Sequence, residues 1–428
     1  MKRFCRRLER FLRGIMTEEL GMKVEDAAAA PMASLFMLHT ESNVGYAIAP
    51  LERLFFETGL ALSHDDQSQV HFSYKSLATG KPRILPENFG NLIELDYSSI
   101  KDGDLDRLTA YAQLNHIKAA VIFDMQPTHP VLGALRRGGV NTILGYYGCE
   151  ISSVNPLWKL CIKRLLFTLS RSKMDGLIFE SKAMADLAVT GRGVPRSRID
   201  IVHLGVDIQT FHPGKSSHVF DVMGLPRDRK VIAYAGHMGV WKGVHSLIRA
   251  AIELLIRRKR TDVSFVLYGN RSNESDQYER MYAGMGIDHL IRFGGYRSDM
   301  AEIYRGCFCG VIPSTGYDSF PRTSVEMAAS GLPVIAARTG GLPESVLHDC
   351  TGIVYEPGNV KELADSIEKL LDQPELAARY SRAGRERCER ELSLEAQYET
   401  FLKIVRSRLQ GLQIPQGRES LVPRLTTR

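Results

Sequence analysis

The chain has 428 residues, which is more than one ordinary hydrophobic core accommodates and which suits two α/β domains. Apolar residues make up 44% and charged residues 24% of the chain, a composition typical of a folded globular protein, so wholesale disorder is excluded. The formal net charge is a modest +6, and no uncharged apolar run reaches about 18 residues, so we predict no membrane-spanning helix.

The seven cysteines are odd in number and scattered, and none forms a C-x-x-C pair. Cys307 and Cys309 lie two residues apart in a strand-like run, and therefore on one face, which is a poor start for a tetrahedral zinc site. We predict free thiols in a reducing cytosol and no metal site.

Residues 1–32 are predicted to form an N-terminal extension that opens on a basic amphipathic helix. Residues 1–16, MKRFCRRLERFLRGIM, carry six cations before position 14 and a single acid. Such a helix can lie on anionic lipid, each nearby Lys or Arg contributing about 1 kcal/mol. The alternatives are a frayed tail and a native start at Met16. A cleaved secretory signal is disfavoured because no uninterrupted apolar core follows the charges.

Residues 33–205 alternate short apolar runs with helical stretches, a pattern typical of βα units around a largely parallel sheet. The first strand runs into the glycine loop SNVGY and then into an amphipathic helix. A glycine loop that opens a helix lets backbone N–H groups approach an anion. We predict strands at 34–39, 70–74, 92–95, 119–123, 141–144 and 176–179, and a helix at 47–60.

Residues 157–173, LWKLCIKRLLFTLSRSK, form a second basic amphipathic segment. One interpretation is a helix that packs on the sheet and keeps its cations in water. The other is a face that meets a membrane or a lipid-linked acceptor.

The next domain is predicted to open with a buried strand at 230–235, the turn GHMGVWKG and a helix at 244–257. Gly236 and Gly239 free the backbone of this turn, and Lys242 places a cation beside a helix N-terminus. Helix-end N–H groups and an ammonium both favour a diphosphate. The spacing of the glycines is not that of the dinucleotide-binding fingerprint, which disfavours an oxidoreductase.

Residues 311–346, VIPSTGYDSFPRTSVEMAASGLPVIAARTGGLPESV, are the most informative stretch of the chain. A strand ends at Pro313, a polar loop follows, and Pro321 stands where a first helical residue is tolerated. Gly331 is placed to end the helix, and a second strand at 333–337 leads to Gly340-Gly341. This order of elements presents a ligand site at the carboxyl ends of parallel strands.

Two carboxylates mark this site, Asp318 in the loop and Glu326 on the helix. The stretch resembles the signature of the family 4 glycosyltransferases, retaining enzymes of the GT-B architecture. Their pattern is an acid, seven residues and a Glu, with Phe two residues after the first acid, a place that Phe320 holds here. The runs GLPVI and GGLPE complete the likeness. The family usually has Glu where this chain has the shorter Asp318.

The resemblance covers most of residues 33–410 and is strongest over 199–358. It implies an α/β GT-B fold in which two Rossmann-like domains face each other across a cleft. We therefore expect an acceptor-side domain at 33–205, with a hinge in the loop 199–213 around Gly-Val-Asp and Phe-x-Pro. We expect a nucleotide-sugar-binding domain to follow at 206–390. After it would come a helix at 391–410, which returns to brace the first domain, and a disordered tail at 411–428.

The resemblance also implies which residues bind the donor. Lys242 holds the place of the family's diphosphate lysine, whereas His237, mostly neutral at pH 7, stands where the family has Arg. Glu326 would accept hydrogen bonds from ribose hydroxyls, and Tyr296 lies in the loop that holds the nucleobase. The full donor-binding set that we expect is Gly45, Gly236, His237, Lys242, Tyr296, Phe320, Arg322, Thr323 and Glu326.

The residues expected to be catalytic are Asp318 and Tyr147. By the resemblance, Asp318 would hold a donor-sugar hydroxyl and stabilise an oxocarbenium-like carbon. Tyr147 stands where family members place a His that reaches the transferred sugar, although a phenol is a poor proton acceptor at neutral pH. His129 is the alternative imidazole. No covalent nucleophile stands out, consistent with front-face transfer that needs no metal or other cofactor.

The implied activity is retaining, hexosyl-type transfer from a nucleotide-diphosphate sugar to a hydroxyl acceptor, in envelope polysaccharide, exopolysaccharide or lipid-linked glycan synthesis. The expected partners are a nucleotide sugar, a glycan or lipid-linked acceptor and an anionic membrane surface, at the cytoplasmic face of the cell membrane. Nucleic acid is not expected, because the basic patches are amphipathic and form no recognised module. The alternative is a degenerate GT-B protein that binds nucleotide or glycan without catalysis, suggested by Asp318, His237 and Tyr147.

Overall fold

The structure is a computed structural model that describes residues 31–44, 48–151, 155–170, 172–270 and 273–411. The predictions for the basic helix at 1–16, for Gly45 and for the tail beyond residue 411 lie outside the described residues.

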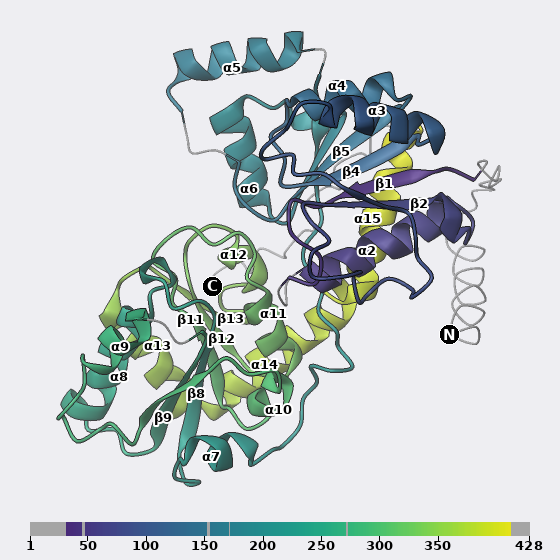
Figure 1. Cartoon of the computed structure of the whole chain (residues 1–428). Coiled ribbons are helices and arrows are strands. Elements are labelled where there is room, and N and C mark those ends of the chain that lie inside the picture. The colour runs from purple at the N-terminus through teal and green to yellow at the C-terminus, as the bar shows by residue number, and fades with distance from the viewer. Residues whose placement is uncertain (1–30, 45–47, 152–154, 171, 271–272, 412–428) are drawn as a thin grey trace, which may run out of the picture.

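Two parallel sheets divide the described chain into two lobes (Figure 1). The first sheet has the order β3-β2-β1-β4-β5-β6-β7, and the second has the order β10-β9-β8-β11-β12-β13. Helices cover both faces of sheets of this kind, so their strands are buried on both sides, and this explains their continuous apolar runs. The strands are β1 Ser34–Met37, β2 Val70–Tyr74, β3 Leu92–Glu94, β4 Ala119–Phe123, β5 Thr142–Tyr147, β6 Gly176–Phe179, β7 Ile199–Ile201, β8 Lys230–Ala235, β9 Val263–Tyr268, β10 Ile291–Gly295, β11 Cys309–Ile312, β12 Val334–Ala337 and β13 Gly352–Tyr355.

The α-helices of the first lobe connect its parallel strands, and those of the second lobe end in three consecutive helices. They are α2 Ile48–Leu62, α3 Asp104–Leu114, α4 Pro130–Arg137, α5 Leu157–Leu169, α6 Lys182–Leu187, α7 His218–Met223, α8 Val244–Ile252, α9 Asn273–Glu279, α10 Met300–Tyr304, α11 Arg322–Ala329, α12 Leu342–Ser345, α13 Val360–Asp372, α14 Pro374–Glu391 and α15 Leu394–Leu409. No helix among these described residues is long and apolar enough to cross a membrane.

Several predicted boundaries differ from the structure. The strand expected to end at residue 144 continues to Tyr147. Helix α8 ends at Ile252 and continues as a π-helical turn, Glu253–Arg257. Pro321 caps helix α11 rather than occupying its first turn, because its ψ of 118° is extended and the helix begins at Arg322.

Helix α15 returns from the second lobe to the first, as predicted (Figure 1). Its Phe401 is fully buried and stacks on Phe55 with 5.8 Å between ring centroids. Near its end, the guanidinium of Arg408 lies 2.7 Å from the carboxylate of Asp200 on β7. The last helix therefore completes the core of the first domain.

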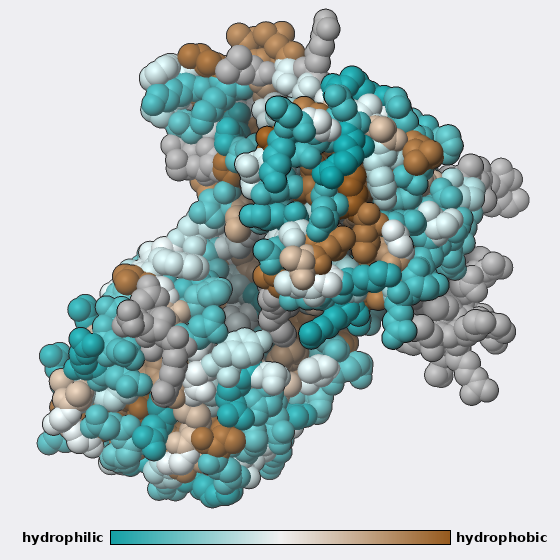
Figure 2. Space-filling model, in the orientation of Figure 1, coloured by the Kyte–Doolittle hydropathy of each residue, from teal (hydrophilic) through white to brown (hydrophobic). Residues whose placement is uncertain are grey.

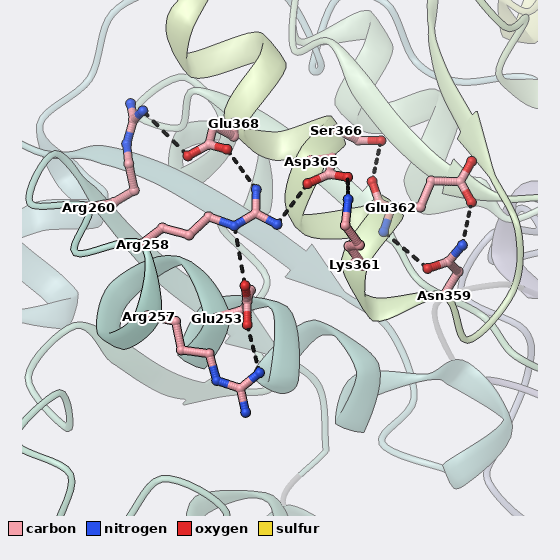
Figure 3. Close-up of polar contacts among 10 residues, drawn as sticks. All are labelled: Glu253, Arg257, Arg258, Arg260, Asn359, Lys361, Glu362, Asp365, Ser366 and Glu368. Atoms are coloured by element: carbon pink, nitrogen blue, oxygen red, sulfur yellow. Dashed lines mark hydrogen bonds and ion pairs between the residues drawn. The ribbon is translucent and has the colours of Figure 1, made fainter.

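An ion-pair cluster holds the π-helical turn against α13 (Figure 3). Arg258 contacts Glu253 of its own turn at 3.4 Å, and Asp365 and Glu368 of α13 at 2.7 and 2.6 Å. Its side chain is only 19% exposed, so solvent screens these contacts less than those of a surface pair.

We expect Arg258→Ala to destabilise the second domain by about 1–2 kcal/mol, because three carboxylates lose their shared cation. The control is Arg257→Ala, whose side chain is 77% exposed and pairs with Glu253. Urea unfolding followed by circular dichroism measures both variants. Equal midpoints for the two variants would show that the cluster adds nothing to stability.

Candidate active site

A cavity of about 600 Å³ opens at the carboxyl ends of the strands in the second sheet. Because these ends meet at one edge of a parallel sheet, side chains from loops far apart in the sequence converge there. The lining residues are Phe211, Tyr234, Ala235, Gly236, His237, Lys242, Tyr268, Gly269, Asn270, Tyr296, Arg297, Ser298, Met300, Tyr304, Ile312, Asp318, Pro321, Arg322, Thr323 and Glu326.

Two loops, one after β8 and one after β11, are joined by backbone hydrogen bonds. The N–H groups of Thr315 and Gly316 donate to the carbonyl of Trp241 at 2.9 and 2.8 Å. Gly243 has φ +70°, and a Cβ at that position would lie 1.8 Å from the carbonyl oxygen of Pro313. Only glycine therefore lets the loops approach this closely, and their approach brings Lys242 to the second loop.

Asp318 is the buried anion of the cavity, with 6% of its surface exposed. Its Oδ2 lies 2.8 Å from the Nζ of Lys242 and accepts a hydrogen bond from the hydroxyl of Ser314, also at 2.8 Å. Gly340 lies so close behind it that an added Cβ would meet the Asp318 carbonyl oxygen at 1.9 Å. The N–H of Gly341 donates to that same oxygen at 2.8 Å, so both the backbone and the carboxylate of Asp318 are fixed.

Helix α11 begins beside this ion pair and turns three side chains toward the cavity: Arg322, Thr323 and Glu326. Pro321 makes no side-chain cap, so the first N–H groups of the helix are left for another acceptor. Glu326 is buried, with 3% of its surface exposed. The cavity thus combines an ammonium, a helix N-terminus and two carboxylates, a set that suits a ligand with a diphosphate and hydroxyl groups.

The two domains contact each other beside this cavity. Both oxygens of Glu344 on α12 accept backbone hydrogen bonds from the start of α6, from Lys182 N–H at 2.7 Å and Ala183 N–H at 2.8 Å. Arg322 donates to the carbonyl of Gly205 in the interdomain connection at 3.1 Å. The first domain therefore faces the open side of the site.

A family model described as Glycosyl transferases group 1 matches residues 218–387, which contain nearly all of the cavity lining. This match covers less than half of the chain. The D-inositol 3-phosphate glycosyltransferase of Mycolicibacterium smegmatis is 33% identical over 218 residues, which are 50% of this chain and 48% of that protein. A protein of the same description from Saccharomonospora viridis is 30% identical over 229 residues, 51% and 52% of the two chains. The chain spans about half the length of the curated relatives it matches.

Solved structures of glycosyltransferases share the fold over nearly the whole chain. A glycosyltransferase from Rickettsia africae superposes with a TM-score of 0.74 and 17% identity, covering 89% of this chain and 100% of that one. The Anabaena protein HepE, solved in complex with UDP-glucose, superposes with a TM-score of 0.68 and 17% identity, covering 88% and 100%. The predicted GT-B fold is confirmed.

Most of the predicted site residues line one cavity. His237 is exposed at its rim, and Tyr296 is 66% exposed. The predicted residues that the structure brings together are Gly236, His237, Lys242, Tyr296, Asp318, Arg322, Thr323 and Glu326.

Two predicted site residues, Tyr147 and Phe320, do not line the cavity, and the prediction for Tyr147 is wrong. Tyr147 is fully buried in the first domain, stacks on Phe179 at 4.8 Å and donates its hydroxyl to the carbonyl of Met125 at 2.7 Å. It is still part of β5, so its side chain belongs to the core and cannot reach a donor sugar. The side chain of Phe320 is 1% exposed and stacks on His203 at 4.8 Å, and the donor contact expected of the backbone N–H groups around Phe320 stays a prediction.

The alternative imidazole, His129, has a local structural role. Its Nδ1 accepts the N–H of Val131 at 3.3 Å, which caps the start of α4. A His before a Pro at a helix start therefore has a sufficient structural explanation.

The sequence analysis missed a polar group at the other end of the cavity. Arg297 donates through Nε and Nη2 to both oxygens of Asp299, at 2.7 and 2.5 Å, and these bonds lower the pKa of Asp299. His218 on α7 lies 2.7 Å from the same carboxylate. Tyr268 at the end of β9 is 2% exposed. The only sequence signal was an Arg and an Asp two residues apart after a strand.

Two carboxyl groups of the first domain, the partly buried Asp124 and the buried Glu180, were not predicted from the sequence. Asp124 follows β4 and accepts the N–H of Gly148 at 2.9 Å, and Glu180 follows β6 and accepts the hydroxyl of Tyr146 at 3.2 Å. Burial raises the pKa of Asp124 to about 7 and that of Glu180 to about 8, while the nearby Arg322 guanidinium opposes the latter shift. They lie at the carboxyl edge of the first sheet, the usual place for ligand contacts.

Proposed function

We propose that this protein is a glycosyltransferase that moves a sugar from a nucleotide-diphosphate sugar to a hydroxyl acceptor. The observation that carries this proposal is the buried pair of Lys242 and Asp318 at 2.8 Å beside the start of α11, inside a cavity of about 600 Å³. In this position, the ammonium of Lys242 can bind the anionic diphosphate of the donor. The carboxylate of Asp318 can accept hydrogen bonds from the hydroxyl groups of the neutral sugar.

In the proposed reaction, the bond from the anomeric carbon to the diphosphate oxygen breaks and a bond to the acceptor oxygen forms. The electron pair of the broken bond remains on the diphosphate, which is stabilised by Lys242 and by the free N–H groups at the start of α11. His237 at the rim adds a second donor. The proton of the acceptor hydroxyl passes to the leaving diphosphate oxygen on the same face of the sugar, which gives retention of configuration without a metal.

The two carboxylates would hold the neutral parts of the donor. The Oδ2 atom of Asp318 contacts Lys242 and Ser314. Its Oδ1 atom takes no part in these two contacts and would accept a hydrogen bond from a sugar hydroxyl. Glu326, on the second turn of α11, is placed for the ribose hydroxyls. The acceptor would enter from the first domain, where Asp124 and Glu180 follow the ends of β4 and β6, the two strands on either side of β5.

Turnover of nucleotide sugars tests this proposal. Purified protein is incubated with UDP-, GDP-, ADP-, dTDP- and CDP-sugars, with a mixture of free sugars, inositol phosphates and lipid extracts as acceptors, with EDTA or with magnesium. We expect release of one nucleoside diphosphate, undiminished by EDTA, and abolished in Asp318→Asn. Binding of a nucleotide with no release in any mixture would favour the binding-only alternative.

We further propose that helix α5 brings the protein to the cytoplasmic membrane surface, where a lipid-linked or envelope glycan is the acceptor. Helix α5 lies at the outer end of the first domain, apart from the sheet (Figure 1), and apolar side chains face outward on it (Figure 2). One stripe at helical spacing is 52–68% exposed: Trp158, Ile162, Leu165 and Leu169.

Cations accompany this stripe, with Lys159 and Arg164 exposed on the same helix. An exposed apolar stripe costs free energy in water, about 25 cal/mol per Å², and its combination with cations fits an anionic lipid surface. The first interpretation from the sequence, a helix packed on the sheet, does not explain why this stripe faces solvent.

We expect the double variant Trp158→Glu/Ile162→Glu to reduce sedimentation with anionic phospholipid vesicles at least about tenfold, because each change places an acid in the apolar stripe. The control is Leu114→Glu, which alters a leucine that is 79% exposed on α3. Truncation of residues 1–16 separates the contribution of the N-terminal segment. Equal sedimentation of the double variant and the control would exclude α5 as the membrane contact.

A further inference from the structure

The two polar groups of the cavity lie at its opposite ends. Lys242 and Asp318 follow β8 and β11, whereas Tyr268 and Arg297 follow β9 and β10. The sheet order is β10-β9-β8-β11, so β10 and β11 are three strand spacings apart, on the order of 14 Å. In a nucleotide sugar whose diphosphate binds at Lys242, the nucleobase would reach the opposite end of the cavity.

Tyr268 carries a buried hydroxyl that has no hydrogen-bond partner among the described residues. The residue lines the cavity and is 2% exposed. Its ring lies against Gly294, where an added Cβ would be 2.2 Å away, so the ring cannot move in that direction. The nearby thiol of Cys307 donates to the carbonyl of Ile303 at 3.2 Å. A buried hydroxyl without a partner is unfavourable, and a ligand atom that hydrogen-bonds to it would remove that cost.

Arg297 offers a second, complementary group at the same end. Asp299 occupies its Nε and Nη2, and Asp299 is itself held by His218 at 2.7 Å. The remaining nitrogen of the guanidinium, Nη1, donates no hydrogen bond to a side chain among the described residues. The Arg297 side chain is 29% exposed. A guanidinium donates and never accepts hydrogen bonds, so it requires an acceptor in the ligand, whereas a phenol can do either.

We propose that Tyr268 and Arg297 recognise the nucleobase of the donor and select a base whose edge pairs a carbonyl with a ring N–H. This inference rests on the proposed function. Arg297 donates to the carbonyl, and the hydroxyl of Tyr268 accepts the neighbouring ring N–H. Uracil, thymine and guanine present this edge. Cytosine and adenine present an amine in place of the carbonyl and an unprotonated nitrogen in place of the N–H.

The mismatch is expected to be costly for the disfavoured bases. An amine facing Arg297 sets donor against donor and leaves both groups without an acceptor, and sites built to hydrogen-bond a ligand reject such analogues strongly. Selection is therefore expected within each ring size, for UDP over CDP and for GDP over ADP.

Isothermal titration calorimetry of the whole protein with UDP, CDP, GDP and ADP tests this inference. The wild type is expected to bind the favoured member of at least one pair about tenfold or more tightly than its partner. Tyr268→Phe should reduce that ratio about tenfold, mainly by weakening the favoured nucleotide. Its thermal midpoint should stay unchanged, because the lost hydroxyl has no partner to lose. The control is Tyr282→Phe, which removes a buried hydroxyl that donates to Ile291 outside the cavity.

The outcomes separate the inference from the proposed function. If the wild type binds CDP and ADP as tightly as UDP and GDP, or if Tyr268→Phe keeps the wild-type ratio, the base-recognition role is wrong while nucleotide binding stands. If none of the four nucleotides binds to folded protein, the proposed function itself is wrong. A loss of the ratio in Tyr282→Phe as well would assign the effect to packing and overturn the role of the Tyr268 hydroxyl.

Discussion

Lys242→Met is expected to lower kcat/KM for nucleotide-sugar turnover about 10²–10³-fold, the loss typical when one preorganised donor to a developing anion is removed. The substitution also removes the cation that lies 2.8 Å from Asp318, a carboxylate that is only 6% exposed. An uncompensated buried charge costs about 3–5 kcal/mol, so the second domain should also become less stable.

A double variant separates these two effects. In Lys242→Met/Asp318→Asn, both charges are gone, so most of the lost stability should return, while turnover should not. The control is Lys361→Met, which changes a lysine that is 81% exposed and paired with Asp365 on α13. Urea unfolding and nucleotide release are measured on each protein. Turnover that recovers together with stability in the double variant would remove Lys242 from the mechanism and leave it a structural residue.

Arg408→Ala is expected to destabilise the first domain by about 3–5 kcal/mol, enough to unfold a marginal domain. Arg408 and Asp200 are 11% and 8% exposed, and the guanidinium contacts the carboxylate at 2.8 and 2.7 Å. The same guanidinium donates to the carbonyl of Ser197 at 3.0 Å. Its removal therefore leaves a buried carboxylate and detaches the end of α15 from β7.

The matched control lies on the same helix. Arg406→Ala removes a single contact to the carbonyl of Ala61 at 3.4 Å, and it should cost less than about 1 kcal/mol. Asp200→Asn in the Arg408→Ala background should restore part of the loss, because the unpaired charge is removed. Thermal unfolding by calorimetry measures the series, and similar midpoints for the two arginine variants would contradict the bracing role of α15.

The elements that could be predicted from sequence are those whose pattern of apolar and polar residues is compatible with only one type of secondary structure. Strands β4 and β6 are short, fully buried apolar runs between polar turns, and both were predicted with the bounds that the structure gives. Asp318 and Glu326 could be assigned to one site because both follow the same strand end. Lys242 could be assigned to the same site because its loop follows another strand and leads into the N-terminus of a helix.

Other features depend on packing that no local pattern shows. Tyr147 was expected in the site because it stands where the resembling family places a His, but β5 runs three residues further than expected and directs its side chain into the core. Phe320 could not be separated from its neighbours in the loop until His203 was seen stacked on it. The partnerless hydroxyl of Tyr268 is a property of its three-dimensional surroundings alone.

The most direct test of nucleotide binding by the second domain is a thermal-unfolding panel with UDP, GDP, ADP, dTDP and CDP. A ligand at about a hundred times its dissociation constant adds roughly 2.7 kcal/mol of stability, which raises the midpoint of a domain of this size by several degrees. We expect at least one nucleotide to produce that rise in the wild type and to produce none in the stable Lys242→Met/Asp318→Asn protein. Unchanged midpoints with all five nucleotides would contradict the assignment of the cavity to a nucleotide-sugar donor.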